Sequence, residues 1–318
     1  MSPEGDGPAA PSPLAAGAFV PAYLEVRGPD ASLAAEATAL VVHGILGSAA
    51  NWRGFLRKLV DQAGPDDAVR RVRWIAVDLR AHGDSTGAPP PHTVAACAAD
   101  LEALAAALGT RFDLVLGHSF GGKVALAHAR DAERPPRATW FLDTPVGGGV
   151  RPEADRTGGQ DEIARVLDAV FALGEDLPPR AEVQERLIAS GLSRGLAQWM
   201  TTNVRGTVDS GYRWKFDLAA VRELISDYFA LNLRPFVERS VRAAGTHAGS
   251  ATARPTLIRG VRGGLSDRFD ASELAWQAGL PELPIHVLPA AGHWLHVDDP
   301  SGLMRLFELA AREVLDRP

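Results

Sequence analysis

Short, continuous runs of hydrophobic residues recur along the chain, separated by stretches in which apolar residues return every three or four positions. A continuous apolar run of about four to eight residues is typical of a strand buried on both faces of a parallel sheet. Residues 23–27 alternate instead between apolar and polar positions, as a half-buried strand does. The predicted strands are residues 23–27, 38–43, 73–79, 112–116, 138–143, 255–259 and 285–288.

Amphipathic patterns between these runs predict helices that cover the sheet. The first of them places Trp52, Phe55 and Leu59 on one face of a helix. The predicted helices of this kind are residues 51–63, 93–108, 121–130 and 301–315. Strands that alternate with helices predict an α/β sheet wound with right-handed crossovers.

The alternation of strands and helices stops between about residues 147 and 241. We therefore expect a helical cap over the carboxyl edge of the sheet, where ligands bind in open α/β sheets. The cap is predicted to contain helices without strands, at residues 161–173, 181–190, 193–203 and 221–233. The predicted organisation is a disordered segment (residues 1–18), an α/β core (19–147 and 242–318) and the cap (148–241).

Composition and charge narrow the class of protein. The 318 residues suit one large domain or a domain with an insertion, and a hydrophobic content of 46% is ordinary for a globular protein. The net charge of -6 provides no electrostatic basis for binding nucleic acid. Cys97 has no second cysteine to pair with, and no apolar run reaches membrane-spanning length. The acidic N-terminus lacks the basic start of a secretion signal, so we expect a cytoplasmic protein, or an organellar one in a eukaryote.

The candidate chemistry centres on a Gly-x-Ser-x-Gly pentad at Gly117, Ser119 and Gly121, between a predicted strand and a predicted helix. This is the context of a nucleophile elbow, in which a sharp turn exposes a reactive hydroxyl. The pentad alone also fits a plain turn, and the stretch that ends at Lys123 fits Gly-x4-Gly-Lys, the pattern of a phosphate loop. The next residue is Val124 rather than Ser or Thr, so the hydroxyl that would hold magnesium is missing.

A serine hydroxyl needs a base before it can act as a nucleophile at neutral pH. His293 is the candidate, because it lies in a loop between the last predicted strand and the closing helix, where the order Ser, acid, His places the base. His293 and His296 together with Asp298 and Asp299 also indicate a metal cluster, but no third imidazole or cysteine lies at a suitable spacing. We therefore expect neither a metal nor another cofactor.

The base needs an acid that orients it, and two residues qualify by position. Asp143 ends the strand after the pentad, and Asp267 follows the next strand, so both lie between the serine and the histidine in the sequence. Backbone N–H groups would stabilise the oxyanion. The candidates are the N–H of Phe120, directly after the nucleophile, and the N–H of Ile45, in the loop after an inner strand.

Four motifs, taken together, resemble the α/β-hydrolase superfamily, and more narrowly its small-acyl carboxylesterase branch. They are VVHGILGS at residues 41–48, VDLRAHGDS at 77–85, GHSFGGK at 117–123 and GHWLH at 292–296. The resemblance implies an α/β-hydrolase fold, with an eight-stranded, mostly parallel sheet and a helical cap. In this branch the acid follows the sixth strand and a serine stands after the seventh. This arrangement favours Asp143 over Asp267, with Ser266 as that serine.

The resemblance implies hydrolysis of carboxylic esters or thioesters of small to medium acyl groups, through an acyl-enzyme on Ser119. The expected partner is a small-molecule ester, and we expect a monomer or a homodimer. The residues expected to line the substrate pocket are His43, Gly44, Leu46, Trp52, His118, Phe120, Trp199 and Trp294, with Leu187, Leu192 and Met200 from the cap. The same triad also suits a cofactor-free perhydrolase (haloperoxidase) or a C–C bond hydrolase, and some members of the fold are non-catalytic small-molecule receptors.

Overall fold

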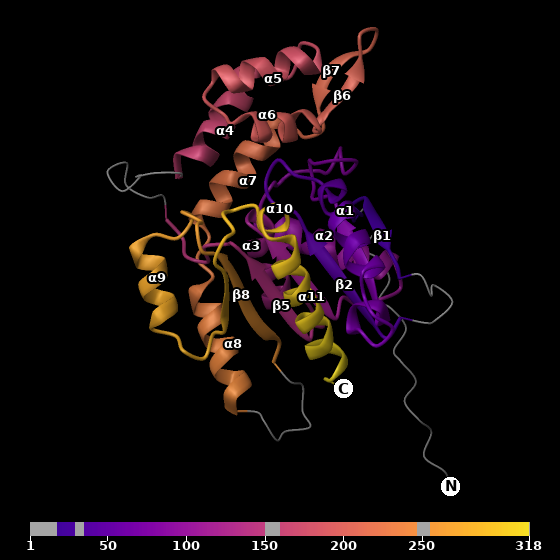
Figure 1. Ribbon diagram of the computed structural model, residues 1–318, viewed down its shortest axis with the longest axis vertical. Helices are drawn as coiled ribbons and strands as arrows, with labels where there is room; N and C mark the ends of the chain where they lie inside the picture. The colour runs from indigo at the N-terminus through magenta and orange to yellow at the C-terminus, as the bar shows by residue number, and fades with distance from the viewer. Residues whose placement is uncertain (1–17, 29–34, 150–159, 247–254, 318) are drawn as a thin grey trace.

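The computed structural model describes residues 18–28, 35–149, 160–246 and 255–317 (Figure 1). Within these residues the main sheet has the strand order β1-β3-β2-β4-β5-β8-β9. All neighbouring pairs are parallel except β1 and β3. The strands are β1 (Tyr23–Val26), β2 (Ala37–Val42), β3 (Val72–Val77), β4 (Leu114–His118), β5 (Ala138–Leu142), β8 (Leu257–Gly263) and β9 (Ile285–Leu288).

The described part of the chain has a seven-stranded main sheet, so the eight strands implied by the resemblance are a wrong prediction for these residues. Each of the seven strands overlaps one predicted run. Residues 1–17, most of the segment expected to be disordered, lie outside the described residues.

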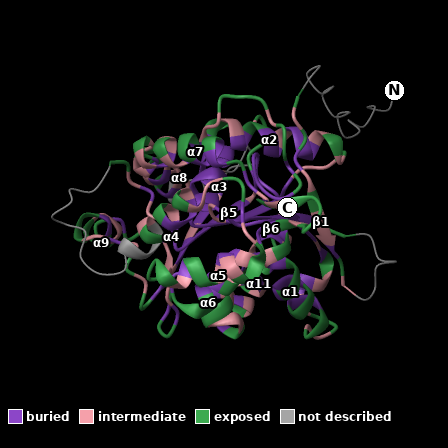
Figure 2. Ribbon diagram, turned by 90° about the horizontal axis from the view of Figure 1, so that it is seen from above, coloured by how far each residue is buried: buried purple, intermediate pink, exposed green. Residues whose placement is uncertain are grey.

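Helices cover both faces of the sheet, so that the strands lie between two helical layers (Figure 2). On one face, α1 (Ala49–Asp61) and α11 (Pro300–Leu315) bury Trp52 and Phe307 against Trp74 of β3. On the other face, α2 (Val94–Ala107) and α3 (Phe120–Asp131) form a second apolar core with β2, β3 and β4. Burial of large apolar side chains on both faces explains why the strands are continuous hydrophobic runs.

A group of helices, which we call the cap, stands above one end of the sheet (Figure 1). It consists of α4 (Gln160–Leu173), α5 (Arg180–Ala189), α6 (Arg194–Thr201), β6 (Val204–Thr207), β7 (Gly211–Trp214) and α7 (Leu218–Ala230). The apolar core of the cap also includes Leu46, from the loop after β2, and packs against Trp294, from the loop after β9. The cap therefore lies over the carboxyl ends of the parallel strands. The division of the chain at residues 148 and 241 stays a prediction.

The prediction of a cap without strands is wrong, because β6 and β7 form an antiparallel hairpin. Each strand has only four residues, too few for a periodicity of two to stand out from the helical patterns around it. The hairpin depends on Gly206, which has a φ of 111°. A Cβ at this position would lie 1.9 Å from the Gly211 carbonyl oxygen.

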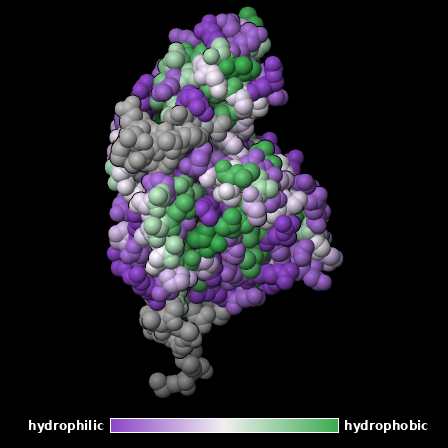
Figure 3. All heavy atoms as spheres, turned by 60° about the vertical axis from the view of Figure 1, so that its left-hand side comes forward, coloured by the Kyte–Doolittle hydropathy of each residue, from purple (hydrophilic) through white to green (hydrophobic). Residues whose placement is uncertain are grey.

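The chain leaves the cap through α8 (Arg234–Thr246), β8, α9 (Ala271–Ala278) and β9, and α10 (Leu295–Asp298) precedes the closing helix. Hydrophobic residues gather on the face of the core below the cap (Figure 3). Exposed large apolar side chains in this part of the chain include Leu265, Leu274 and Val287. No helix among the described residues combines the length and the apolar character needed to cross a membrane.

Candidate active site

Ser119 lies at the tip of a sharp turn between β4 and α3, and its backbone has a φ of 53° and a ψ of -118°. Such a conformation is strained for a residue with a Cβ. The turn is this tight because its neighbours are glycines: a Cβ on Gly117 would lie 2.0 Å from the Gly121 carbonyl oxygen, and a Cβ on Gly121 would lie 2.5 Å from the Val42 oxygen. The pentad therefore forms the strand, turn and helix of a nucleophile elbow.

The structure brings together three side chains that are far apart in the sequence. The Oγ of Ser119 lies 3.1 Å from Nε2 of His293, and Nδ1 of His293 lies 2.7 Å from Oδ2 of Asp143. All three side chains are buried, and Asp143 is fully enclosed. Hydroxyl, imidazole and carboxylate are thus connected in the order that a nucleophile, a base and an orienting acid require.

Asp143 is held by donors from the neighbouring strand and loop. Its carboxylate accepts hydrogen bonds from the Gly263 N–H, at 2.9 Å, and from the Ser266 hydroxyl, at 2.5 Å. Strand β8 is longer than predicted and ends at Gly263, which places this N–H at the carboxylate. Asp267 is exposed on the loop after β8. Of the two candidate acids, the one that reaches His293 is Asp143.

Burial sets the protonation state of His293, the candidate base. It lowers the pKa of His293 well below 6.5, and Arg268 and His296 act in the same direction. Burial also raises the pKa of Asp143, while the hydrogen bonds from Ser266 and Gly263 oppose this rise. At pH 7 His293 is therefore neutral, with its Nδ1–H donated to Asp143 and its Nε2 left to accept the Ser119 hydroxyl.

Two loops fix the backbone beside the serine. Phe120 is the first residue of α3, where no preceding helical turn accepts its N–H, and Ile45 lies in the loop after β2. The next residue, Leu46, has a φ of 61° and donates its N–H to Nε2 of His82 at 3.1 Å. Burial lowers the pKa of His82 to about 3, so this ring is neutral and can accept. Both predicted oxyanion donors thus lie on backbone that borders Ser119.

Ser119 and Ile45 line two cavities. The first, which we call the Trp199 cavity, contains five of the residues expected in the pocket, namely Gly44, Leu46, His118, Trp199 and Trp294. Its full lining is Gly44, Ile45, Leu46, His118, Ser119, Val166, Trp199, His293 and Trp294. The second, which we call the Phe229 cavity, is lined by Ile45, Ser119, Phe120, Leu167, Ile225, Tyr228, Phe229 and Arg268. Apart from Arg268, the side chains of the Phe229 cavity are mainly apolar.

Some residues expected in the pocket have other roles. His43 is buried, with Nδ1 bonded to the Gly44 carbonyl oxygen and Nε2 accepting the Leu79 N–H. Trp52 is buried and stacks on His296, with ring centroids 4.6 Å apart. The cap residues that line neither cavity and pack instead in the core of the cap are Leu187, Leu192 and Met200.

Sequence reasoning missed most of the cap side of the Phe229 cavity. Leu167 lies on α4, and Ile225 and Phe229 lie four positions apart on α7. An apolar helical spacing is the same for a helix face that packs in a core and for one that lines a cavity. Arg268 stands next to the candidate acid Asp267, and its position gave no signal of a cavity wall. No local pattern could therefore have identified these residues.

The alternative interpretations of these motifs do not fit the geometry. The four residues of the suggested metal cluster are used elsewhere: Asp298 accepts the Gly292 N–H, and Asp299 caps α11 at the Gly302 N–H. Among the described residues, no group of three or more potential ligands could hold a metal ion. The Lys123 ammonium group donates to three backbone carbonyl oxygens rather than facing an open phosphate loop.

The parallel sheet, the elbow after β4 and a histidine on the loop after the last strand define an α/β hydrolase. The chain belongs to the alpha/beta hydrolase family, which it matches over residues 39–306. Family membership confirms the fold class and the resemblance read from the four motifs. It marks the protein as a hydrolase.

Several known proteins are similar to this chain. The sn-1-specific diacylglycerol lipase ABHD11 of Mus musculus is 27% identical over 269 residues, which cover 83% of this chain and 77% of that protein. Its counterpart in Danio rerio is 25% identical, over 83% of this chain and 75% of that protein. Among solved structures, a marine microorganism esterase has a TM-score of 0.70 at 18% identity, and covers 91% of this chain and 98% of its own. The structural similarity shows the fold.

Proposed function

We propose that the protein hydrolyses carboxylic esters or thioesters of small to medium acyl groups through an acyl-enzyme on Ser119. The observation that carries this proposal is the continuous pair of contacts from Ser119 Oγ to His293 Nε2, at 3.1 Å, and from His293 Nδ1 to Asp143, at 2.7 Å. Metal-independent acyl transfer needs this set of groups.

In the first half of the reaction, the Ser119 oxygen attacks the acyl carbon while Nε2 of His293 takes the hydroxyl proton. Asp143 keeps the proton of the neutral imidazole on Nδ1 and stabilises the imidazolium that forms. The carbonyl oxygen becomes an oxyanion, and the N–H groups of Ile45 and Phe120 stabilise it. Each such donor contributes roughly 3 to 4 kcal/mol to transition-state stabilisation.

The tetrahedral intermediate then collapses, and His293 returns the proton to the leaving alcohol or thiol. In the second half, a water molecule gives its proton to His293 and attacks the acyl carbon, and the Ser119 oxygen leaves as the hydroxyl. Water replaces the alcohol as acceptor, so the products are a carboxylic acid and an alcohol or thiol.

We assign the two halves of the ester to the two cavities. The leaving oxygen must lie near Nε2 of His293, because this atom protonates it. His293 lines the Trp199 cavity, so we place the alcohol there and the acyl chain in the Phe229 cavity. The Phe229 cavity can bury an apolar acyl chain against Phe120, Leu167, Ile225 and Phe229. Such burial stabilises the complex by about 25 cal/mol per Å² of apolar surface removed from water. The names of the relatives in Mus musculus and Danio rerio, diacylglycerol lipases, describe esters of this apolar kind.

A panel of p-nitrophenyl esters tests the proposed activity. We expect kcat/KM to rise from acetate to butyrate and octanoate, because each added methylene that enters the Phe229 cavity contributes about 0.8 kcal/mol, and to fall for palmitate. Release of p-nitrophenolate under steady-state conditions measures it. Absence of turnover on every ester, with a small molecule still bound, would instead support the receptor interpretation.

The pH dependence tests the role of the base. Protonated His293 cannot accept the serine proton, so kcat/KM falls as pH falls through the pKa of His293. Burial lowers this pKa well below 6.5, so we expect the acidic limb of the kcat/KM profile to lie below pH 6.5. The profile is measured with p-nitrophenyl butyrate, with acid release followed by titration. A limb with its midpoint above pH 7 contradicts the assignment of a buried, neutral base.

A further inference from the structure

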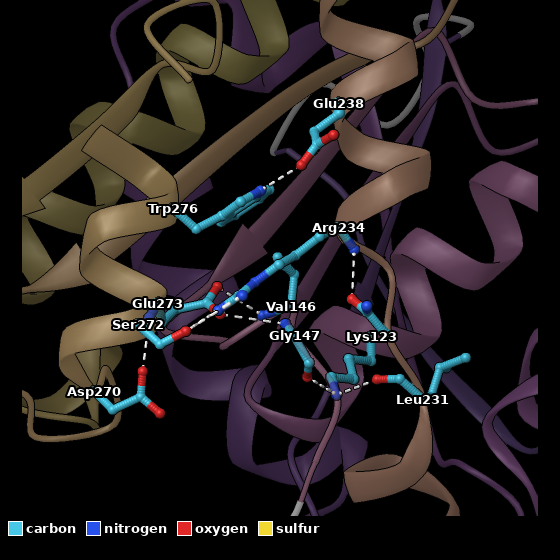
Figure 4. Close-up of polar contacts among 11 residues, drawn as sticks. Lys123, Val146, Gly147, Leu231, Arg234, Glu238, Asp270, Ser272, Glu273 and Trp276 are labelled. Carbon is cyan, nitrogen blue, oxygen red and sulfur yellow. Dashed lines mark hydrogen bonds and ion pairs between the residues drawn. The ribbon is translucent and has the colours of Figure 1, made fainter. Parts of the chain in front are cut away.

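The mechanism leaves one buried cation unused. Lys123 lies on α3, four positions after Ser119, and only 1% of its side chain is exposed. Its ammonium group donates hydrogen bonds of 2.7 Å to the carbonyl oxygens of Gly147 and Leu231 (Figure 4). It donates a third, also of 2.7 Å, to the carbonyl oxygen of Tyr228. Three acceptors for three N–H bonds satisfy the donor capacity of a lysine. The ammonium group is therefore fully hydrogen-bonded to the protein backbone, although it is buried.

The three carbonyl oxygens belong to the two segments that connect the cap with the core. Gly147 lies on the segment that follows β5, and Tyr228 and Leu231 lie at the end of α7. The segments also bond directly to each other, through the Gly149 N–H to the Phe229 oxygen at 2.7 Å and through the Leu233 N–H to the Val146 oxygen at 2.9 Å. Lys123 therefore joins both connections to the helix that follows the nucleophile.

We call these two connecting segments, together with Lys123, the junction. A second buried charge supports the junction from the opposite side (Figure 4). Glu273 of α9 is 2% exposed and accepts the N–H groups of Val146, at 3.0 Å, and Gly147, at 3.3 Å. It also pairs with Arg234 at the start of α8, at 2.6 Å. Removal of one member of such a buried network leaves the others without partners, so the junction is rigid only when the network is complete.

The junction borders the acyl half of the candidate site. Tyr228 and Phe229 line the Phe229 cavity with Ser119 and Phe120, and the Lys123 ammonium lies 4.3 Å from the centroid of the Tyr228 ring. Phe120 and Lys123 stand three positions apart on α3, and therefore on the same side of that helix. The helix α3 thus carries Phe120, which lines the cavity, and through Lys123 it holds the carbonyl of Tyr228, another lining residue.

We propose that Lys123 is a positioning residue that ties the two cap connections to α3 and so fixes Tyr228 and Phe229 as the wall that selects the acyl chain. The proposal rests on the proposed function, because it concerns the cavity assigned to the acyl group. The Lys123 ammonium group donates no hydrogen bond to the residues that line the Trp199 cavity. Its effect is therefore on acyl selectivity rather than on the choice of leaving group.

The test compares selectivities in the full-length protein. Lys123→Met should lower the ratio of kcat/KM for p-nitrophenyl octanoate to that for p-nitrophenyl acetate by roughly 10-fold, the scale of a poorly fitted apolar group. The loss should lie mainly in a raised KM for octanoate, because acetate is too short to reach the displaced wall. The ratio for 1-naphthyl acetate to p-nitrophenyl acetate, which varies only the leaving group, should stay as in the wild type.

Three control variants separate positioning from stability. Lys58→Met makes the same change at an exposed site on α1 and should leave both ratios unchanged. Leu56→Ala destabilises the core between α1 and the sheet, by about 2 to 5 kcal/mol, and should also leave them unchanged. Lys123→Gln keeps two donors on a shorter side chain, so its octanoate ratio should fall between those of the wild type and Lys123→Met.

The pH dependence of the wild-type protein offers a second test. Burial lowers the pKa of Lys123 to about 8, opposed by Glu273 and Asp227, while Arg234 acts in the same direction as burial. Above pH 8 the amine loses one of its three donors, so the octanoate-to-acetate ratio should decline as pH rises through about 8. Both esters use the same triad, so its titration cancels in the ratio, and Lys123→Met should show no such decline.

An octanoate ratio that stays constant in folded Lys123 variants, and across this pH range in the wild type, would overturn the positioning role while leaving ester hydrolysis intact. A similar loss in Leu56→Ala would also overturn it, because general destabilisation would then account for the effect. If the wild type hydrolyses none of the esters, the proposed function itself fails.

Discussion

Ser119→Ala is expected to lower kcat for p-nitrophenyl butyrate by about 10⁴-fold or more, because the change removes the oxygen that forms the acyl bond. KM should change little, since the alanine leaves the walls of both cavities in place. The side chain also carries no capping hydrogen bond for α3, so folding should be preserved. Steady-state kinetics measure the loss, and labelling with a fluorophosphonate followed by peptide mass spectrometry locates the nucleophile.

A serine on the protein surface provides the matched control. Ser301 is exposed on α11, so Ser301→Ala should keep wild-type turnover and wild-type labelling. Thermal unfolding of both variants shows whether the fold is intact. Fluorophosphonate labelling that persists in Ser119→Ala at the wild-type rate would refute Ser119 as the nucleophile.

The second large effect is expected at the acid. Asp143→Asn should reduce kcat by about 10⁴-fold, because an amide that donates to Nδ1 of His293 stabilises the wrong tautomer of the ring. Asp267→Asn should change kcat by less than about threefold. Substitutions of exposed residues usually change the free energy by no more than about 0.5 kcal/mol. The two variants make the same chemical change at two aspartates on neighbouring loops. Their kcat values for one ester, compared with the melting temperatures, measure the difference.

The contrast between these variants has a clear structural basis. Asp143 is fully buried, and its carboxylate lies 2.7 Å from His293, whereas Asp267 is exposed on the loop after β8. A larger loss of kcat in Asp267→Asn than in Asp143→Asn would reverse the assignment of the acid. Equal losses, with lowered melting temperatures in both, would point to damage of the fold rather than to chemistry.

Backbone strain collects around the candidate site. Among the described residues, the non-glycine residues with positive φ are Leu46, Ala81, Ser119 and Asp143. Each such residue costs on the order of 1 to 3 kcal/mol and persists only where its surroundings impose it. Three of the four are the proposed nucleophile, the proposed acid, or a residue of the loop proposed to stabilise the oxyanion. The surrounding hydrogen bonds, such as that from Leu46 to His82, therefore hold the site in a conformation that the isolated segments would not adopt.

Much of the fold was predictable from local pattern. The hydrophobic runs coincide with the strands of the main sheet, and the Gly-x-Ser-x-Gly pentad lies between a strand and a helix as expected. These features depend on interactions between residues close in the sequence: side-chain periodicity, and the steric need for Gly117 and Gly121 in a tight turn. The hairpin of β6 and β7 was missed because its strands are too short to show a periodicity.

Local pattern alone established the α/β class, the order of the strands along the chain and the serine and histidine on which the proposed chemistry depends. Contacts between distant segments decided the rest. They placed Asp143 rather than Asp267 at His293, put Trp199 on a cavity but Met200 inside the cap, and turned Lys123 toward three carbonyl oxygens. The reason is physical: which atoms meet depends on how separate segments pack, and a single helical or strand period is the same whether a face meets a core, a cavity or another chain segment.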